Sequence, residues 1–396
     1  MNEKFTILIE KDPDLLDNAD RLSARFRPHC GEFFTLKSRH VMKNEVELKL
    51  AVSADFAAFL SQEISAFRIL AQETQLLGNC YYDTPQYFFA AQHMGLRVRK
   101  AGERYTFTLK TDGKSLGGLH IRPEYNVELD NPQPDLPKLI NTYRLEPAWR
   151  NFTLQPIFAT DFERRAWLVE CGNGVVVEIA LDQGEIRAGD KREPICEVEF
   201  ELKQGRIEDL LHFVAALSLE NGVRLSALSK AQRGYRLAGR ETVTIKNWLE
   251  SWREFLQFTQ QAINSRQKLT ALFQLEQDLI EETVALGAEY LAQDFLCTVE
   301  RIGAFFNLYH FYTENGGLLE GALHERLEQG LTADEGEENL TALVESNTRL
   351  LSQIKAIICL HSENRNNRQA LDKLLELLQS ALYVKRMLHL IFLTLN

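Results

Sequence analysis

The chain has 396 residues, of which 45% are hydrophobic and 26% are charged. At roughly 100–200 residues for each domain, this length and composition indicate two or three domains with sizeable cores, and they exclude a disordered or fibrous protein. The formal net charge of −11 argues against a surface that coats nucleic acid, so any phosphate chemistry needs a local basic cavity.

The cysteines and the apolar runs bear on location. Six cysteines occur singly, with no CxxC pair and no Cys/His spacing typical of a zinc site. No apolar run reaches the ~18 residues of a membrane span, and the first residues lack the pattern of a signal peptide. We therefore expect a cytoplasmic protein whose partners include neither a membrane nor nucleic acid.

Residues 1–41 have short mixed runs without a clear period, and Met42 stands directly before the first strong strand pattern. We expect residues 1–41 to be a non-native or poorly ordered extension and the native chain to begin at Met42.

From residue 44 to about residue 240, period-two alternation is interrupted by short turns, as antiparallel strands with two different faces require. About nine strands are expected, which is enough for a barrel. They are Asn44–Val52, Leu77–Tyr82, Gly95–Ala101, Tyr105–Thr111, Leu119–Glu128, Ile157–Glu163, Ala166–Cys171, Val175–Asp182 and Ile195–Lys203. Helices are expected at Ala54–Ser65, Pro85–Gln92 and Gly205–Leu219.

Beyond Thr244 the apolar residues follow the period of amphipathic helices, which predicts a helix bundle. Breaks are expected near Asn315–Gly317 and Leu331–Glu338, and Gln369–Leu395 is expected to form one long helix. Residues 241–396 hold 13 Lys and Arg against 22 Asp and Glu, which leaves a near-neutral 32 against 34 for residues 1–240.

Charged residues alternate along the expected strands. In the first strand Glu45, Glu47 and Lys49 share one face. Alone, this pattern is as typical of a surface strand with a solvent-exposed outer face as it is of a strand that carries a functional site. Similar charged faces recur, however, and acidic strands at both ends of the region are distinct from basic strands in its middle. The recurring faces are Arg97 and Arg99; Thr106, Thr108 and Lys110; Arg122, Glu124, Asn126 and Glu128; Glu178 and Asp182; and Glu197, Glu199, Glu201 and Lys203.

If these faces point inward, the lumen of a barrel combines carboxylates for a divalent metal with Arg and Lys for a polyanion. A linear triphosphate carries about four negative charges, so its binding needs several cations and bidentate Arg forks. Carboxylates without Cys or His partners favour Mg²⁺ or Mn²⁺. The pattern therefore suits hydrolysis of a triphosphate.

These motifs together resemble the CYTH family of triphosphate tunnel metalloenzymes, and within it the bacterial inorganic triphosphatases. The resemblance covers about residues 42–238, and its motifs occur in the family's order. It is carried by Glu45-x-Glu47-x-Lys49, Tyr82–Pro85, Leu96–Arg99, Leu109-Lys110, Arg122–Tyr125, Glu178–Gly184 and Glu197-x-Glu199. The resemblance implies an α+β protein, with an eight-stranded antiparallel tunnel followed by an all-α helical bundle at residues 239–396.

The resemblance also implies roles for residues. The metal ligands are expected to be Glu45, Glu47, Glu124, Asp182, Glu197 and Glu199. Phosphate oxygens are expected to be held by Arg97, Arg99, Lys110, Arg122, Arg164 and Lys230. The catalytic residues are expected to be Lys49, Glu47 and Glu45, which would orient or activate the attacking water. Glu201 ranks lower at the rim, Glu178 and Glu128 are interpreted as solvent-facing or paired, Arg165 as a surface residue and His120 as scaffold.

The implied activity is Mg²⁺- or Mn²⁺-dependent hydrolysis of tripolyphosphate to pyrophosphate and phosphate. Thiamine triphosphatase and class IV adenylate cyclase use similar tunnels and stay open as alternatives. A non-catalytic polyphosphate-binding module is a further alternative from another class.

In the inorganic triphosphatase subgroup a helical CHAD domain, associated with polyphosphate binding, commonly follows the tunnel. This chain has helices in the same place, but they are acidic and hold only four histidines, namely His310, His324, His361 and His389. We therefore expect a degenerate CHAD-like domain at residues 239–396 with a scaffolding role or a protein partner.

Overall fold

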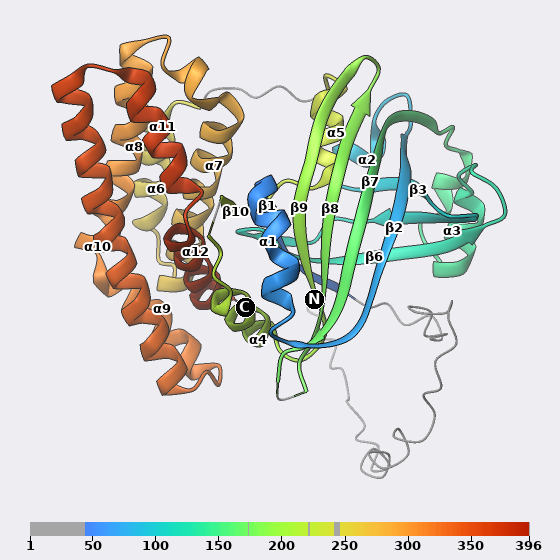
Figure 1. Ribbon diagram of the computed structural model, residues 1–396, viewed down its shortest axis with the longest axis horizontal. Coiled ribbons are helices and arrows are strands. Elements are labelled where there is room, and N and C mark those ends of the chain that lie inside the picture. The colour runs from blue at the N-terminus through green and yellow to red at the C-terminus, as the bar shows by residue number, and fades with distance from the viewer. Residues whose placement is uncertain (1–43, 173, 221, 241–245, 396) are drawn as a thin grey trace, which may run out of the picture. The chain divides into compact units, whose positions relative to one another are not determined.

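The computed structural model describes residues 44–172, 174–220, 222–240 and 246–395 (Figure 1). The extension expected at residues 1–41 lies outside the described residues. From Met42 onward the chain forms one compact unit. None of the described helices is long and apolar enough to cross a membrane.

Eight strands form a closed antiparallel barrel. They are β1 (Asn44–Val52), β2 (Arg68–Asp83), β3 (Gly95–Ala101), β4 (Arg104–Lys110), β6 (Leu119–Leu129), β7 (Gln155–Glu170), β8 (Val176–Ala188) and β9 (Lys191–Gln204). They pair in the order β1-β9-β8-β7-β2-β3-β4-β6, and pairing of β6 with β1 closes the barrel. Two short strands extend the sheet: β5 (Lys114–Leu116) pairs with β6, and β10 (Val223–Leu225) pairs with β1. The predicted fold class is thus confirmed.

Several strands are longer than the sequence indicated. The two strands expected at 157–163 and 166–171 are one strand, β7, because Arg164 and Arg165 continue the ladder opposite Asp182 and Leu181 of β8. The first half of β2, from Arg68 to Leu76, was not expected. Its side chains are exposed or partly exposed on both faces, so its sequence lacks the apolar alternation of a half-buried strand. It nevertheless pairs with β7 along its length.

Short helices cover the ends and sides of the barrel. They are α1 (Ala54–Ile64), α2 (Phe88–Ala91), α3 (Leu136–Tyr143), α4 (Ile207–Ala216) and α5 (Lys230–Leu237), with a 3₁₀ helix at Pro147–Asn151. The helix expected at Pro85–Gln92 shrinks to α2, whose backbone amides at Phe89 and Ala90 donate to the buried Asp83 carboxylate. Helix α5 was not expected. It begins with a capping box in which Ser229 and Gln232 satisfy each other's backbone amides.

Seven helices follow among the described residues. They are α6 (Trp248–Thr259), α7 (Ser265–Leu291), α8 (Phe295–Glu314), α9 (Gly316–Glu328), α10 (Ala333–Asn364), α11 (Asn367–Leu378) and α12 (Ala381–Thr394). The break expected near Asn315 is confirmed. The break expected at 331–338 is shorter, because Thr332 caps α10 and residues 333–338 are helical. The single helix expected at 369–395 was wrong: Ser380 accepts a hydrogen bond from the Tyr383 amide and starts α12 as a separate helix.

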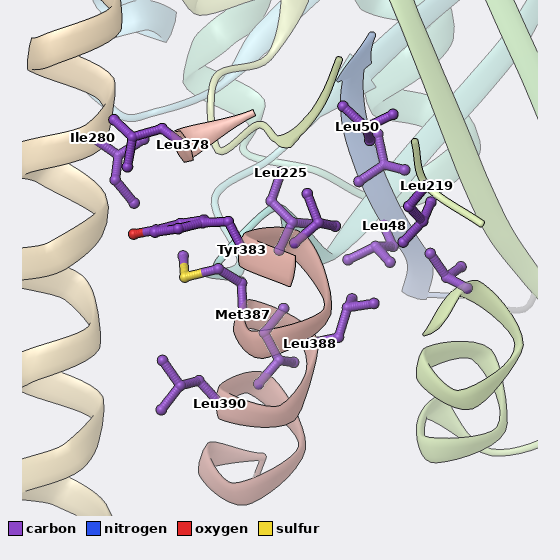
Figure 2. Packing of buried hydrophobic residues seen from close by; sticks show 14 of the residues in the cluster. Leu48, Leu50, Leu219, Leu225, Ile280, Leu378, Tyr383, Met387, Leu388 and Leu390 are labelled. Carbon is purple, nitrogen blue, oxygen red and sulfur yellow. The ribbon is translucent and has the colours of Figure 1, made fainter. Parts of the chain in front are cut away.

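The helices pack directly on the outside of the barrel. Leu48 and Leu50 project from the outer face of β1, and Leu225 of β10 lies between this strand and Leu388 of α12 (Figure 2). Leu48 and Leu50 have no exposed surface, although they belong to a barrel strand. One apolar core therefore runs from the barrel wall into the helices. The division into a tunnel domain at 42–238 and a helical domain at 239–396 stays a prediction.

Candidate active site

The strand register brings the charged faces of neighbouring strands together inside the barrel. Lys49 of β1 lies opposite Glu199 of β9, and Glu47 lies opposite Glu201 of β9 and His120 of β6. Because side chains alternate along each strand, these partners project to the same side. The same parity places Leu48 and Leu50 outside, in the core shared with the helices. The sequence-based assignment of inner and outer faces on β1 therefore holds.

Three carboxylates, which we call the carboxylate triad, lie close together on β8 and β9. Asp182, Glu197 and Glu199 can each offer one oxygen such that all three oxygens lie within 4.8 Å of one another. Lys230 Nζ lies 2.6 Å from Asp182 Oδ2 and 2.8 Å from Glu199 Oε1, and it also pairs with Glu197. Lys49 Nζ lies 3.2 Å from Glu197 and 3.3 Å from Glu199. Two lysines thus offset the mutual repulsion of three buried carboxylates.

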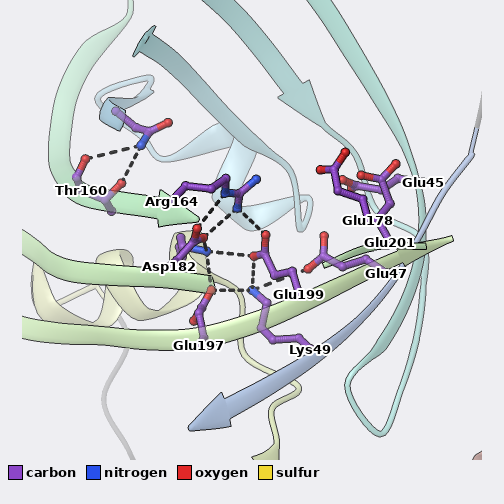
Figure 3. Close-up of polar contacts among 12 residues, drawn as sticks. Glu45, Glu47, Lys49, Thr160, Arg164, Glu178, Asp182, Glu197, Glu199 and Glu201 are labelled. Carbon is purple, nitrogen blue, oxygen red and sulfur yellow. Dashed lines mark hydrogen bonds and ion pairs between the residues drawn. The ribbon is translucent and has the colours of Figure 1, made fainter. Parts of the chain in front are cut away.

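Arg164 of β7 completes this arrangement. It donates two hydrogen bonds of 2.7 Å to Asp182 and one of 2.6 Å to Glu199 (Figure 3). Burial opposes ionisation of Glu199, but Lys230, Lys49 and Arg164 hold its pKa well below the usual range. Glu199 is therefore ionised at neutral pH.

A second carboxylate group, formed by Glu45, Glu47 and Glu124 of β1 and β6, surrounds Lys110. Lys110 Nζ donates to Glu45 at 2.6 Å and lies 3.0 Å from Glu124 and 3.8 Å from Glu47. Burial raises the pKa of Glu45 to about 7, with the neighbouring carboxylates contributing. Burial acts in the same direction on Glu47, but Lys110 and Lys49 lower its pKa. The six predicted metal ligands thus fall into two groups. Lys49, which pairs with two members of the triad, also lies 3.8 Å from Glu47 of the second group.

The predicted phosphate-binding arginines line the second group. Arg97 lies 3.7 Å from Glu124, and Arg122 lies 3.8 Å from Glu45 and 4.0 Å from Glu47. The Nε atoms of both arginines are buried and donate no hydrogen bond within the described part of the chain. Buried donors that lack an acceptor are costly, and oxygens of a polyanion would satisfy them.

Arg99 differs from Arg97 and Arg122 because its Nε atom has a hydrogen-bond acceptor within the protein. Its Nε donates to Asn79 at 2.9 Å, and Asn79 in turn donates to Thr160 at 3.0 Å. Burial lowers the pKa of Arg99 to about 9, and the nearby Arg97 and Arg164 add to this effect. The extra positive charge makes this part of the lumen favourable for an anion.

The donor set fits a hard divalent cation. Glu47 Oε1 is buried and accepts no hydrogen bond from the described residues, so it is available as a ligand. The triad supplies three more carboxylates, and oxygen donors of this kind suit Mg²⁺ or Mn²⁺. The residues present therefore fit the metal that the sequence predicts.

Some lumen residues were missed or ranked low. Arg233 donates to Glu197 at 3.1 Å and to Glu193 at 2.7 Å. Arg233 stands three positions after Lys230, so the two side chains share one face of α5. This spacing points to Arg233 only when residues 230–237 are known to be helical. Glu178 and Glu201 share Lys203 as a partner, at 3.1 and 2.7 Å.

Two lower-ranked residues have clear positions. His120 is buried opposite Glu47, and its Nε2 finds no hydrogen-bond partner among the described residues. Burial lowers the pKa of His120 to about 4, so its ring is neutral at pH 7. Arg165 contacts Glu163 and Gln183, and its side chain is 32% exposed, which agrees with the expected surface position.

A closed barrel with carboxylates and cations sorted along its lumen defines a charged-tunnel protein. The CYTH domain family matches residues 43–235. The inorganic triphosphatase of Haemophilus influenzae is 43% identical over 354 residues, which are 89% of this chain and 97% of that relative. The chain belongs to the CYTH family. Because the 354-residue match is longer than the CYTH segment, the likeness extends to residues outside it.

Solved structures are more distant. The putative adenylyl cyclase of Hippeastrum, described as having a dominant triphosphatase activity, is 18% identical with a TM-score of 0.36, over 50% of this chain and 97% of that one. A putative adenylate cyclase from Bacillus halodurans is 18% identical with a TM-score of 0.29, over 52% and 96% of the two chains. These similarities are too low to support an inference about function.

Proposed function

We propose that the protein is an inorganic triphosphatase that hydrolyses tripolyphosphate to pyrophosphate and phosphate. The observation that carries this proposal is the lumen itself, in which two carboxylate groups alternate with buried cations. The 43% identity with the Haemophilus influenzae inorganic triphosphatase, over nearly the whole of that relative, supports the same activity.

Asp182, Glu197, Glu199 and Glu47 would hold Mg²⁺ or Mn²⁺. The bound metal would supply Lewis-acid stabilisation of charge on the phosphate oxygens. Glu45 and Glu124 complete the predicted ligand set, although in this structure Lys110 contacts both of them.

The cations of the lumen would hold the substrate. Arg97 and Arg122 offer buried donors that lack acceptors in the described chain, and Lys110 lies between them and the carboxylates. Arg99, Arg164 and Lys230 add charge toward the triad. Such a clamp fixes a linear polyanion and stabilises the charge that develops during transfer to water. Lys49, Glu47 and Glu45 stay the predicted residues for orienting and activating that water.

Phosphate release tests this proposal. Wild-type protein would be incubated with tripolyphosphate, ATP or thiamine triphosphate, each with Mg²⁺, Mn²⁺ or chelator. We expect turnover of tripolyphosphate that requires a divalent metal. Preferred turnover of thiamine triphosphate, or cyclic AMP formation from ATP, would favour the other tunnel enzymes. Tripolyphosphate binding without turnover of any substrate would favour a non-catalytic module.

For the helices after residue 246 we infer a degenerate CHAD-like domain that supports the tunnel. Support comes from their acidic composition, which is a poor match for polyphosphate, and from the apolar core that they share with β1. A protein partner for these helices and a cytoplasmic location stay predictions.

A further inference from the structure

Strand β1 changes its hydrogen-bonding partner beside Lys49. On one edge it pairs with β6 through Leu48, and from Leu50 onward it pairs with β10. At the change, the Lys49 amide donates to Gly118 O at 2.9 Å, and the Ser226 amide donates to Lys49 O at 3.0 Å. The backbone of Lys49, which pairs with two members of the triad, is thus held by two separate segments, the turn before β6 and the residue after β10.

Helix α7 contacts both of these segments with one face. Phe273, Gln277 and Glu281 are spaced by four residues and therefore line the same side of the helix. A Cβ atom added at Gly117 would lie 2.7 Å from the Phe273 ring and 2.9 Å from Gln277 Nε2. Gly117 also has a φ of +62°. The turn before β6 is therefore seated closely against α7.

Glu281 holds the second segment. Its Oε1 accepts hydrogen bonds from Arg224 Nη1 at 2.7 Å and from the Ala227 amide at 3.2 Å. The two paired side chains are only 13% and 18% exposed. This pair is therefore less screened by water than a surface ion pair, and it fixes both a side chain and a backbone amide of the same segment.

The segment that Glu281 holds leads straight into the active site. Three residues after Ala227, Lys230 opens helix α5 and reaches the triad. Ser226, next to Ala227, is the residue that bonds to Lys49 O. A shift of residues 224–227 would therefore move both lysines that neutralise the triad.

We propose that Glu281 is a positioning residue through which the helical region sets the geometry of the tunnel. It contacts none of the predicted catalytic or binding residues directly. It acts through the Arg224–Ala227 segment on Lys230 and Lys49. This inference rests on the proposed triphosphatase function and assigns a task to the helices that the predicted scaffolding role does not specify.

The test compares Glu281→Ala and Glu281→Gln with Glu289→Ala, an exposed acidic residue further along α7. For Glu281→Ala we expect a KM for tripolyphosphate raised about tenfold, because small displacements at a clamp are costly. Glu281→Gln keeps an oxygen that can accept from the Ala227 amide, so we expect partial rescue. The control should keep the wild-type KM. A purely structural loss would lower the active fraction and leave KM unchanged.

Calorimetric binding of tripolyphosphate without divalent metal gives a second readout. We expect the dissociation constant of Glu281→Ala to be about tenfold weaker than that of the wild type. If the wild type is active and both Glu281 variants keep its KM, the inference is overturned while the proposed function stands. If the wild type binds tripolyphosphate but does not hydrolyse it, the proposed function fails, and the comparison of dissociation constants alone decides the inference. If the wild type does not bind tripolyphosphate, both the proposed function and the inference fail. Should Glu281→Ala not fold, Arg224→Ala removes the same pair from the other side and must raise KM as well.

Discussion

Lys230 shows how single residues make a dense carboxylate site possible. Its ammonium group contacts all three members of the triad. Burial acts to lower the pKa of Lys230, but Asp182 and the two glutamates outweigh this effect and raise the pKa. Three carboxylates within 4.8 Å of one another repel each other in their charged form unless cations lie beside them. Lys230, Lys49 and Arg164 thus place three cationic side chains beside the three carboxylates.

Glu47 has a buried carboxylate oxygen, Oε1, that accepts no hydrogen bond from the described residues. We expect Glu47→Gln to lower metal-dependent turnover of tripolyphosphate by about 100-fold or more, because an amide is a weak ligand for a hard cation. Circular dichroism should show an intact fold. Glu163→Gln, on the exposed outer side of β7, is the matched control. Normal activity of Glu47→Gln would remove this residue from the metal site.

Arg97 has a buried guanidinium nitrogen that lacks an acceptor in the described structure. We expect Arg97→Ala to raise the KM for tripolyphosphate about tenfold or more, because a charge-assisted hydrogen bond to the substrate is lost. Steady-state kinetics would measure this change. Arg165→Ala, which removes an arginine from the outer side of β7, should leave KM unchanged. An unaltered KM in Arg97→Ala would contradict the clamp role.

At the scale of elements, helix α5 delivers Lys230 because it docks tightly on β7. A Cβ at Gly234 would overlap the Phe158 ring, so this glycine allows the close approach. We expect Gly234→Ala to destabilise the protein by about 1–3 kcal/mol, measured by urea unfolding. Gly303→Ala in α8, where an added Cβ would meet no described atom within 4 Å apart from the helix's own adjacent backbone, should instead stabilise by roughly 0.5–1 kcal/mol. Equal effects of the two substitutions would refute the docking explanation.

Helix α12 carries a histidine that ties stability to pH. Burial lowers the pKa of His389 to about 4, and nearby His212 and Lys385 act in the same direction. An unfolded histidine takes up its proton near pH 6.5, so the contribution of His389 is complete above that pH and is lost as the pH falls toward 4.

We therefore expect the free energy of unfolding to fall between pH 6.5 and 4, with His389 contributing at most about 1.4 kcal/mol for each pH unit. His389→Gln should flatten this dependence, measured by urea unfolding at several pH values. His324→Gln, at a side chain that is 75% exposed, should not. A profile with the wild-type slope in His389→Gln would show that other groups cause the loss.

For the whole molecule, the helices are part of the barrel's support. Leu225 of β10 lies against α12, and Leu48 and Leu50 of β1 are buried in the same apolar cluster (Figure 2). We expect a fragment of residues 42–240 to unfold at a lower temperature than the full chain and to bind a hydrophobic dye, because each uncovered leucine forfeits about 1.5–3 kcal/mol. Calorimetry of both proteins would measure this. An equally stable fragment without dye binding would contradict the shared core.

The sequence by itself determined which side chains share one face of a strand. Alternation along a strand is a local property, so Glu45, Glu47 and Lys49 could be assigned to one face from spacing alone. The resemblance of its motifs to the CYTH family implied the closed antiparallel barrel, and the apolar period predicted the helices after it. The sequence did not reveal α5, because a short helix that follows a three-residue strand carries little periodic signal.

Only the tertiary structure decided which of the charged residues meet. The triad depends on the register between β8 and β9, and Lys230 reaches it from a helix that lies 26 residues after the end of β9. The support of Lys49 by α7 likewise joins residues more than 200 positions apart. Register, barrel closure and helix docking are set by long-range packing, which the local pattern of a sequence does not encode.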